Sequence, residues 1–275
     1  DAAETLQYGA LSPTCRDIHR IRRDATHAMR VETNDKLVGR NRKIAQYLFF
    51  FSFGILILGL FLTNRQAFGA ANTDELILGG VLSAVVIVVA FVSTIASVRM
   101  TNLWVREPRP EALLREGLKG LSNKAVLYNY YYFPARHVLI SPQGVFAITT
   151  RWQDGRFTNE GDQWTSRKSL PNRLFSLLRF DSIGNPTHDA IRSAQHVQKL
   201  LAPIAPDVPV QPIIIFTSPR AEVTLVNPTV PVLRAQDKMT PNLRDYLRGI
   251  DKEARVSLTP QQIEAFEKAT LPARS

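Results

Sequence analysis

Two uncharged apolar runs constrain this chain more than any other feature. They cover residues 44–63 (IAQYLFFFSFGILILGLFLT) and residues 76–98 (LILGGVLSAVVIVVAFVSTIASV). Each has the length of about 20 residues that a helix needs to cross a hydrocarbon layer of roughly 30 Å. Two buried core helices are the alternative, but helices of soluble proteins rarely remain uncharged over such a length. The sequence therefore predicts a transmembrane helical hairpin.

The charges that flank the two runs predict their orientation. Residues 1–45 contain nine Lys and Arg, whereas residues 64–75 contain one Arg and two acids. Basic residues next to membrane spans favour the cytoplasmic side. We therefore expect a two-pass protein of the cell (plasma) membrane, with both termini in the cytoplasm and an external loop over residues 64–75.

Small side chains recur along the second run at steps of four, seven, four and three residues. Such steps return to one face of a helix, and small residues on a shared face let helices approach closely in lipid. The face could pack against the first run or against another membrane subunit, and the two uses are compatible. Membrane lipids and other subunits are therefore the expected partners of this run. The residues are Gly79, Ser83, Ala90, Thr94 and Ser97.

The rest of the chain divides around the hairpin (44–98). A basic cytoplasmic segment (1–43) precedes it, and a connector (99–109) leads to a domain over residues 110–275. Alternating helical and strand patterns predict an α/β fold with a mixed sheet for that domain. Helices are predicted near 16–29, 110–121, 187–201, 241–249 and 259–269, and strands near 125–133, 137–140, 145–152, 209–217, 223–226 and 230–233.

The formal net charge of +10 is concentrated after the hairpin, where residues 99–275 hold 24 bases and 16 acids. This excess suits anionic lipid headgroups or nucleic acid, and charge alone does not separate them. Residues 167–180 mix bases with bulky apolar side chains, which favours either the membrane surface or a cap on the domain core. The predicted contacts to anionic lipid or nucleic acid are Arg156, Arg167, Lys168, Arg173 and Arg179.

Residue types that bind metals and cofactors are sparse. The chain has one cysteine, Cys15, and its five histidines lack a ligand-like spacing such as His-x-x-x-His. Glycine-rich phosphate loops and the G-x-S-x-G nucleophile motif are missing from the sequence. We therefore expect no bound metal and no cofactor.

The run RHVLISPQGVFAITTRWQDGRF…GDQW, followed by NPTHDAIRSAQHVQKLL and PVQPIIIF, resembles the nuclease-related domain called NERD. That family is allied to the restriction-endonuclease-like fold and is often fused to membrane spans. The resemblance covers about residues 110–216. It implies a restriction-endonuclease-like mixed sheet for the cytoplasmic domain.

In active members of that broader fold, an acid on one strand and a Glu-x-Lys on the next hold a divalent metal ion. Carboxylate oxygens are the ligands that such hard cations require. In this chain the aspartate, glutamate and lysine positions hold Arg136, Thr149 and Arg151, and a later glutamine position holds Asp189. Glu111 and His137 remain from the family pattern.

The resemblance therefore implies a degenerate catalytic site with no catalytic residues. A guanidinium about 5 Å from a divalent cation costs about 6–7 kcal/mol at an effective dielectric of about 20. The nearest acids, Asp154, Glu160 and Asp162, fall in predicted turns. We expect a membrane-anchored pseudo-nuclease that serves binding or assembly, as an accessory subunit of a membrane complex. A membrane-tethered nucleic-acid binder and an active metal-dependent nuclease are the alternatives.

Overall fold

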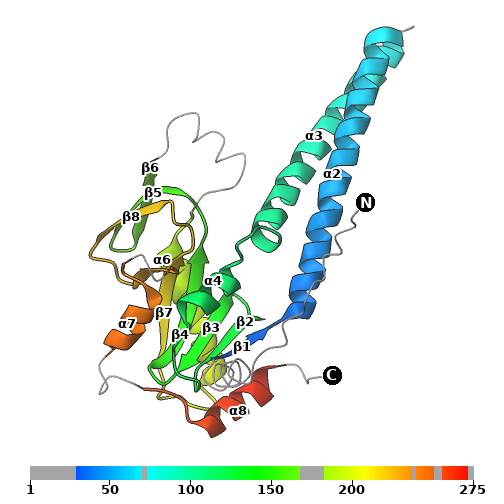
Figure 1. Cartoon of the computed structure of the whole chain (residues 1–275). Coiled ribbons are helices and arrows are strands. Elements are labelled where there is room, and N and C mark those ends of the chain that lie inside the picture. Colours follow the sequence, from blue (N-terminus) through cyan, green and yellow to red (C-terminus); the bar gives the residue numbers. More distant parts are fainter. Residues whose placement is uncertain (1–28, 70–72, 168–182, 237–239, 251–255, 272–275) are drawn as a thin grey trace, which may run out of the picture.

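The computed structural model describes residues 29–69, 73–167, 183–236, 240–250 and 256–271. It consists of an α/β domain from which a long helical hairpin projects (Figure 1). The hairpin is formed by α2 (Asp35–Gly69) and α3 (Thr73–Trp104), which pack side by side. The helices of the domain are α4 (Pro110–Gly117), α6 (Pro186–Leu201), α7 (Leu243–Gly249) and α8 (Pro260–Thr270).

The strands form two sheets. The larger sheet has the order β1-β2-β3-β4-β7-β9, in which β3 is antiparallel to both neighbours and the other pairs are parallel. The smaller sheet has the order β6-β5-β8. The predicted α/β class with a mixed sheet is confirmed. The strands are β1 (Arg30–Thr33), β2 (Val126–Tyr132), β3 (Ala135–Ser141), β4 (Gly144–Arg151), β5 (Gly155–Glu160), β6 (Gln163–Arg167), β7 (Val210–Phe216), β8 (Ala221–Val226) and β9 (Val232–Arg234).

Both hairpin helices are long and apolar enough to cross a membrane. Most of the large apolar side chains exposed on the described residues belong to them, for example Phe50, Leu60 and Leu78. The two predicted runs lie inside the helices, which extend beyond each run and take up most of the predicted loop. The hairpin thus presents lipid-compatible side chains to its surroundings instead of burying them.

The small-residue face of α3 is used inside the hairpin. Ser83, Ala90 and Ser97 are buried, and α2 is the helix packed along α3. The approach is close, because a Cβ added at Gly59 of α2 would lie 3.3 Å from the Val86 Cγ1 atom. This packing supports the expectation that the small-residue face packs against the first apolar run. Docking of another membrane subunit stays a prediction.

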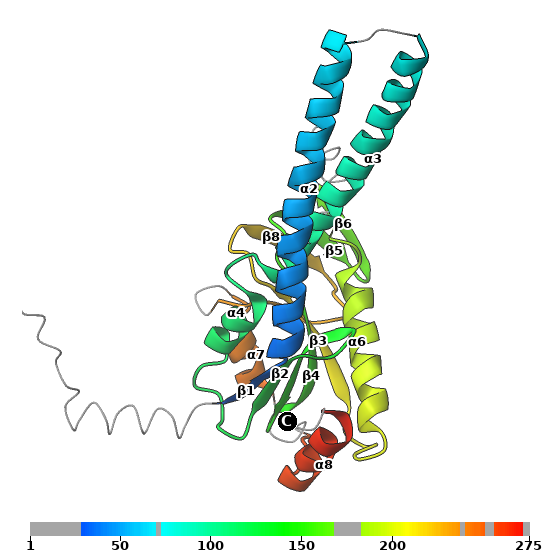
Figure 2. The ribbon, with the colours of Figure 1, turned by 90° about the vertical axis from the view of Figure 1, so that its right-hand side faces the viewer.

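The larger sheet is covered on both faces, and alternation along the strands sorts the side chains. On one face Tyr128 of β2 and Val138 of β3 pack with α6 and α8. On the other face Leu127 and Leu139 pack with α4 and α7. Figure 2 shows α6 on one side of the sheet and α4 with α7 on the other. Successive strand residues point to opposite faces, so strands buried on both faces read as continuous apolar runs.

The hairpin joins the sheet at both of its ends. The Asn34 backbone N–H donates to the Asn129 carbonyl (3.1 Å), and the Asn34 side chain caps α2 by accepting from the Leu37 N–H (3.1 Å). At the other end Trp104 of α3 packs on Tyr130 of β2, with ring centroids 5.3 Å apart. The hairpin is therefore fastened to the domain by the sheet edge and by an aromatic contact.

This joint corrects two predicted boundaries. The segment 1–43 is not separate from the domain, because residues 30–33 form the edge strand β1 and pair in parallel with β2. The connector 99–109 is shorter than predicted, because α3 continues to Trp104, whose buried ring holds the helix end against the domain. The predicted helix near 16–29 lies almost wholly outside the described residues.

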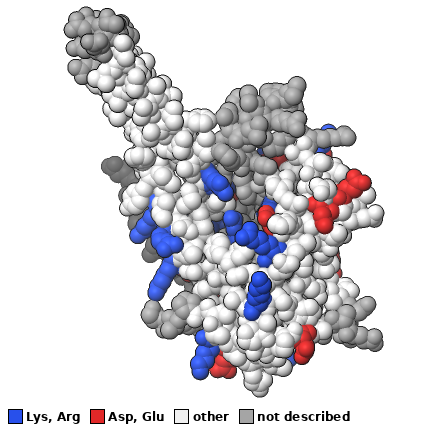
Figure 3. All heavy atoms as spheres, turned by 180° about the vertical axis from the view of Figure 1, so that it is seen from behind, with Lys and Arg blue, Asp and Glu red and all other residues white. Residues whose placement is uncertain are grey.

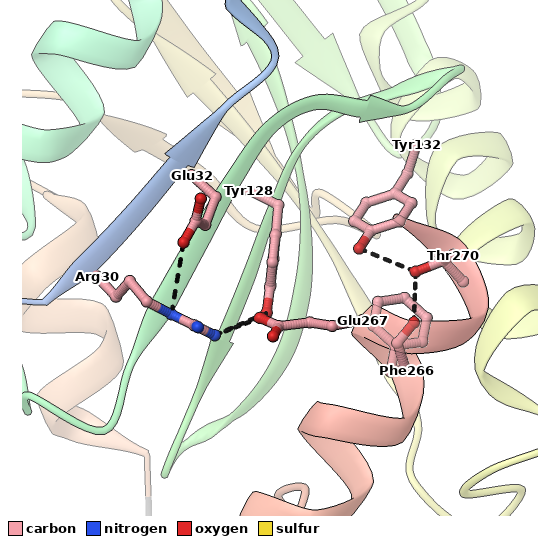
Figure 4. Close-up of polar contacts among 7 residues, drawn as sticks. All are labelled: Arg30, Glu32, Tyr128, Tyr132, Phe266, Glu267 and Thr270. Carbon is pink, nitrogen blue, oxygen red and sulfur yellow. Dashed lines mark hydrogen bonds and ion pairs between the residues drawn. The ribbon is translucent and has the colours of Figure 1, made fainter. Parts of the chain in front are cut away.

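The C-terminal helix α8 is held on the sheet by a cluster of polar contacts (Figure 4). Glu267 of α8 accepts hydrogen bonds from the Tyr128 hydroxyl and from the Arg30 guanidinium. Burial and the Glu267 carboxylate raise the pKa of Tyr128, so its hydroxyl stays protonated and donates. Nearby, the Thr270 hydroxyl lies 3.2 Å from the Tyr132 hydroxyl. The cluster thus links β1, β2 and α8.

Candidate functional site

A cleft of about 450 Å³ lies at the foot of the hairpin. Its walls come from the end of α3, from β3 and β4, and from the first turns of α6. Lys and Arg side chains gather on this face below the hairpin (Figure 3). Asp189 is the one carboxylate that lines the cleft in the described part of the chain. The cleft arginines are Arg99, Arg136, Arg151 and Arg192.

The local fold explains why these side chains meet. Arg136 is exposed on β3, whereas its neighbour His137 is buried, as strand alternation requires. Thr149 and Arg151 are two residues apart on β4 and therefore share a face. Asp189 and Arg192 are three residues apart on α6, a spacing that places both on one helix face. Asn185 fixes the start of α6 by accepting from the His188 N–H at 3.0 Å.

The charges in the cleft do not balance. The Arg151 guanidinium forms an ion pair with Asp189. Burial lowers the pKa of Arg151, and the Asp189 carboxylate acts in the opposite direction. The protein packed around Arg136 also lowers its pKa by desolvation, although the side chain still reaches solvent, and the nearby Arg99 adds to that effect. Guanidinium groups nevertheless stay protonated in proteins. Among the described residues that line the cleft, four positive charges therefore face one carboxylate.

Three of the four cations are uncompensated by any residue that the structure describes. Among the residues that the structure describes, Arg99, Arg136 and Arg192 have no ion pair within 4.0 Å. The Arg151 Nε atom is buried and, in the same described ranges, has no hydrogen-bond partner. The cleft thus holds donors and charge beyond what its own acceptors use.

Glu111, which remains from the family pattern, does not line this cleft. Its carboxylate accepts from the Tyr130 hydroxyl at 2.8 Å and lies 2.6 Å from the Arg109 Nη2 atom. Tyr130 is the residue on which Trp104 packs. Glu111 is therefore engaged at the joint between hairpin and domain.

His137 is fully buried beneath the cleft. Its Nδ1 atom lies 2.8 Å from the Asn129 Oδ1 atom, and the Asn129 Nδ2 atom donates to the Thr33 hydroxyl. Because the amide oxygen is an acceptor, His137 Nδ1 carries the proton. Burial, with a smaller contribution from Arg136, lowers the pKa of His137 to about 3. The imidazole is therefore neutral and has a structural role.

The acids in the turns also have structural partners. Asp154 accepts from the Ser218 hydroxyl and the Arg220 guanidinium. Asp162 accepts from the Thr229 hydroxyl. Neither residue lines the cleft.

The structure separates the predicted anion contacts. Arg156 is exposed on the smaller sheet and pairs with Glu222 at 2.8 Å, away from the cleft. Arg167 ends β6, and its side chain is not described. Lys168, Arg173 and Arg179 lie outside the described residues.

Sequence reasoning missed Arg99 and Arg192 as members of the cleft. The spacing of Arg192 from Asp189 on α6 is a signal that could have found it. Arg99 has no such signal, because its place depends on how the hairpin sits on the domain.

The donor set does not fit a divalent metal ion. Of the aligned positions, Arg136, Thr149 and Arg151 carry no carboxylate, and Asp189 is already paired with Arg151. A hard cation requires several oxygen ligands and is repelled by guanidinium groups. In the described ranges, no group of three or more His, Cys, Asp and Glu is placed to hold a metal. The arrangement is instead suited to an anion.

Comparison with known proteins finds a family that matches part of the chain. Residues 109–217 match the family model of the nuclease-related domain, NERD. The match begins at the residue before α4 and ends just after β7, so it includes the β3, β4 and α6 walls of the cleft. The chain therefore carries a nuclease-related domain behind two long apolar helices. No curated protein and no solved structure matches the chain.

Proposed function

We propose that this protein is a membrane-anchored, catalytically inactive nuclease-related domain that binds an anionic ligand. One observation carries the proposal: in the described part of the chain, Arg136, Thr149 and Arg151, where the family resemblance would place metal ligands, line a cleft with four arginines and one engaged carboxylate. Without metal, the charge that develops on a phosphate during cleavage lacks its usual stabilisation. Arginines retained around such a cleft still bind anions.

The membrane anchor is the second part of the proposal. The exposed apolar surface of α2 and α3 matches what lipid-facing helices require. Nine bases before the first apolar run favour a plasma-membrane protein with both termini in the cytoplasm. A reporter fused after Ser275 should then be cytoplasmic, and one inserted near Gly69 external. An external reporter at Ser275 would contradict this arrangement.

Assembly with a larger membrane complex is the third part. The small-residue face of α3 packs within the hairpin, so a partner subunit would contact other surfaces of the two helices. Their exposed apolar side chains offer such surfaces. Crosslinking in native membranes from residues on those surfaces should capture a partner subunit. Crosslinks to lipid alone would remove assembly from the proposal.

Inactivity is tested by cleavage assays on the full chain in a neutral detergent. Labelled single-stranded DNA, double-stranded DNA and RNA are incubated with Mg²⁺ or Mn²⁺, beside an active metal-dependent nuclease in the same buffer. We expect no metal-dependent products, and no change on Glu111→Ala. Metal-dependent turnover that Glu111→Ala abolishes would overturn the proposal.

Nucleic-acid binding without cleavage is the second candidate function. The surplus of positive charge in the cleft favours it, because a phosphate backbone releases counterions when arginines neutralise it. Gel-shift titrations over a range of salt concentrations test this candidate. Binding that weakens steeply with salt and is lost in Arg136→Gln would support it.

A further inference from the structure

We propose that the arginine cleft binds a phosphomonoester group, carried either by a lipid headgroup of the adjacent leaflet or by a small soluble molecule. The inference rests on the proposed function in one respect, namely that the cleft binds and does not cut. It goes further by naming the chemical class of the ligand. It also assigns a binding role to Arg99, a residue of the hairpin and not of the nuclease-related domain.

The charge of the cleft favours a doubly charged ligand. Arg99, Arg136 and Arg192 form no ion pair within the described residues, so about three positive charges are uncompensated. A phosphomonoester carries a charge of about −1.5 to −2 at pH 7 and three strong acceptor oxygens. Guanidinium forks bind such oxygens in pairs. A phosphodiester has a single charge and two such oxygens, and would leave more of the cleft uncompensated.

The shape of the cleft favours a compact group. Its volume of about 450 Å³ lies within the range of roughly 300–1,000 Å³ that small-molecule sites occupy. Trp152 on its wall is not an open stacking platform, because the Arg106 guanidinium lies 4.4 Å from the ring centroid. A nucleic-acid strand relies on such platforms for its bases. The described walls therefore recognise phosphate better than they recognise a base.

The position of the cleft explains how a lipid would reach it. Arg99 directly follows the second apolar run, and Asn102 lies about one helical turn further along the same wall. If the hairpin crosses the membrane, this wall lies at the level of the cytoplasmic headgroups. A phosphate held by Arg99, Arg136 and Arg192 would link α3 to β3 and α6. Occupancy of the cleft would thereby fix the domain against the hairpin.

The test uses the full chain in a neutral detergent. Native mass spectrometry counts the bound molecules of short-chain phosphatidic acid, which ends in a phosphomonoester. Phosphatidylglycerol, a diester, and phosphatidylcholine, which has no net charge, serve as comparison lipids. Thermal unfolding with inorganic phosphate and glycerol 3-phosphate measures the soluble ligands, because a ligand of the folded state raises Tm.

The test variant is the double change Arg136→Gln and Arg192→Gln. Both side chains are exposed and form no ion pair within the described ranges, so the fold should tolerate the change. The matched control changes two exposed bases outside the cleft that form no ion pair within the described ranges, Arg115→Gln and Lys124→Gln. Removal of each charge-assisted hydrogen bond to the phosphate should weaken binding about tenfold.

Two results support the inference. A lipid source is identified if the wild type and the control bind phosphatidic acid more tightly than the two comparison lipids. The test variant should then bind phosphatidic acid at least tenfold more weakly. A soluble source is identified if glycerol 3-phosphate binds at least as tightly as phosphatidic acid and its binding depends on the variants in the same way.

Other results overturn it. They are binding that is equal in the wild type and the test variant, no preference for the phosphomonoester, or no binding at all. Tighter binding of single-stranded DNA that needs Arg136 and Arg192 would replace this inference with nucleic-acid binding. These outcomes leave the absence of cleavage untouched, whereas metal-dependent turnover overturns the proposed function itself.

Discussion

Arginine meets carboxylate in two regions of this protein, and the balance of charge differs between them. At the junction of β1, β2 and α8, Arg30 lies between Glu32 and Glu267, and Glu267 also accepts from the Tyr128 hydroxyl (Figure 4). Among the described residues of the cleft, four arginines face one carboxylate, Asp189, which pairs with Arg151. Within the described residues, the first region satisfies its own charges and the second does not.

The difference separates stability from binding. Arg30 and Glu267 are 237 residues apart, so their contact fastens the edge strand and the C-terminal helix to one sheet. The cleft arginines contribute few stabilising contacts, because only Arg151 among them forms an ion pair in the described part of the chain. Uncompensated like charges lower stability, and sites that bind ligands often bear that cost. The four predictions that follow test this contrast, from the largest expected effect to the smallest.

Removal of Glu267 should have the largest effect on stability. Glu267→Ala leaves the largely buried Tyr128 hydroxyl and the Arg30 guanidinium without their shared acceptor. We expect the free energy of unfolding to fall by about 2–3 kcal/mol, the usual cost of such unsatisfied groups. Urea titration of the full chain in detergent measures it. The control Glu264→Ala, exposed on the same helix, should stay within about 0.5 kcal/mol of the wild type. An equal loss of stability in Glu267→Ala and Glu264→Ala would show that the cluster has no structural role.

Removal of Asp189 should cost less and should increase anion binding. Asp189→Asn leaves the mostly buried Arg151 without its partner, but Asp189 is about half exposed, at 54 %, so solvent compensates in part. We expect a loss of about 1 kcal/mol in the free energy of unfolding. The affinity for inorganic phosphate, measured by calorimetry, should rise because the net charge of the cleft increases. A lower affinity would show that the carboxylate helps to hold the ligand.

The two arginines Arg30 and Arg136 give a direct comparison of the regions. Arg30→Gln should lower the free energy of unfolding by about 1 kcal/mol, because its two carboxylate partners lose the cation that pairs with them. Arg136→Gln should leave it unchanged or raise it by up to about 0.5 kcal/mol, because a repulsive charge is lost. Both values come from the same urea titrations. A larger loss for Arg136→Gln would mean that the cleft is structural.

The smallest effect concerns the pH dependence of stability. The folded protein keeps His137 neutral down to pH about 3, whereas the unfolded chain takes up the proton near pH 6.5. The unfolded state therefore binds more protons between these values, and this group lowers stability as pH falls through that window.

Because Arg136 contributes to the low pKa of His137, Arg136→Gln should raise that pKa and make the fall in stability shallower by a few tenths of a kcal/mol. Arg192→Gln, which lacks this effect on His137, should keep the wild-type slope. Because the folded-state pKa of His137 is about 3, the difference appears below pH 5, so unfolding measured between pH 5 and pH 3 in the three proteins tests this. Parallel curves would contradict the electrostatic link between the cleft and the core.

The sequence predicted the elements whose apolar pattern is strong. The helix near 187–201 and the strand near 209–217 lie within two residues of α6 and β7, because both bury a dense apolar pattern. The edge strand β1 and the β5–β6 hairpin were missed. In β1 no residue is fully buried, and in β5 Phe157 is the one buried apolar residue, so their apolar pattern is weak. Their parallel partners, β2 for β1 and β8 for β5, lie far away in the chain.

The candidate site was predicted in part. Arg136, Thr149, Arg151 and Asp189 were expected to mark one degenerate site, and the structure brings all four to the cleft. Glu111 and His137 were expected beside them and have structural partners elsewhere. The contribution of Arg99 depends on the joint between hairpin and domain, which no local pattern encodes.

Mn²⁺ binding tests most directly whether this cleft has exchanged metal ligation for anion binding. Electron paramagnetic resonance of free Mn²⁺ during titration of the full chain counts the bound ions. As a positive control, the double change Arg136→Asp and Thr149→Glu returns two carboxylates to the cleft. We predict that the wild type binds no Mn²⁺ in the cleft and that the double variant gains one ion. Mn²⁺ bound by the wild type and released by Asp189→Asn would contradict the account.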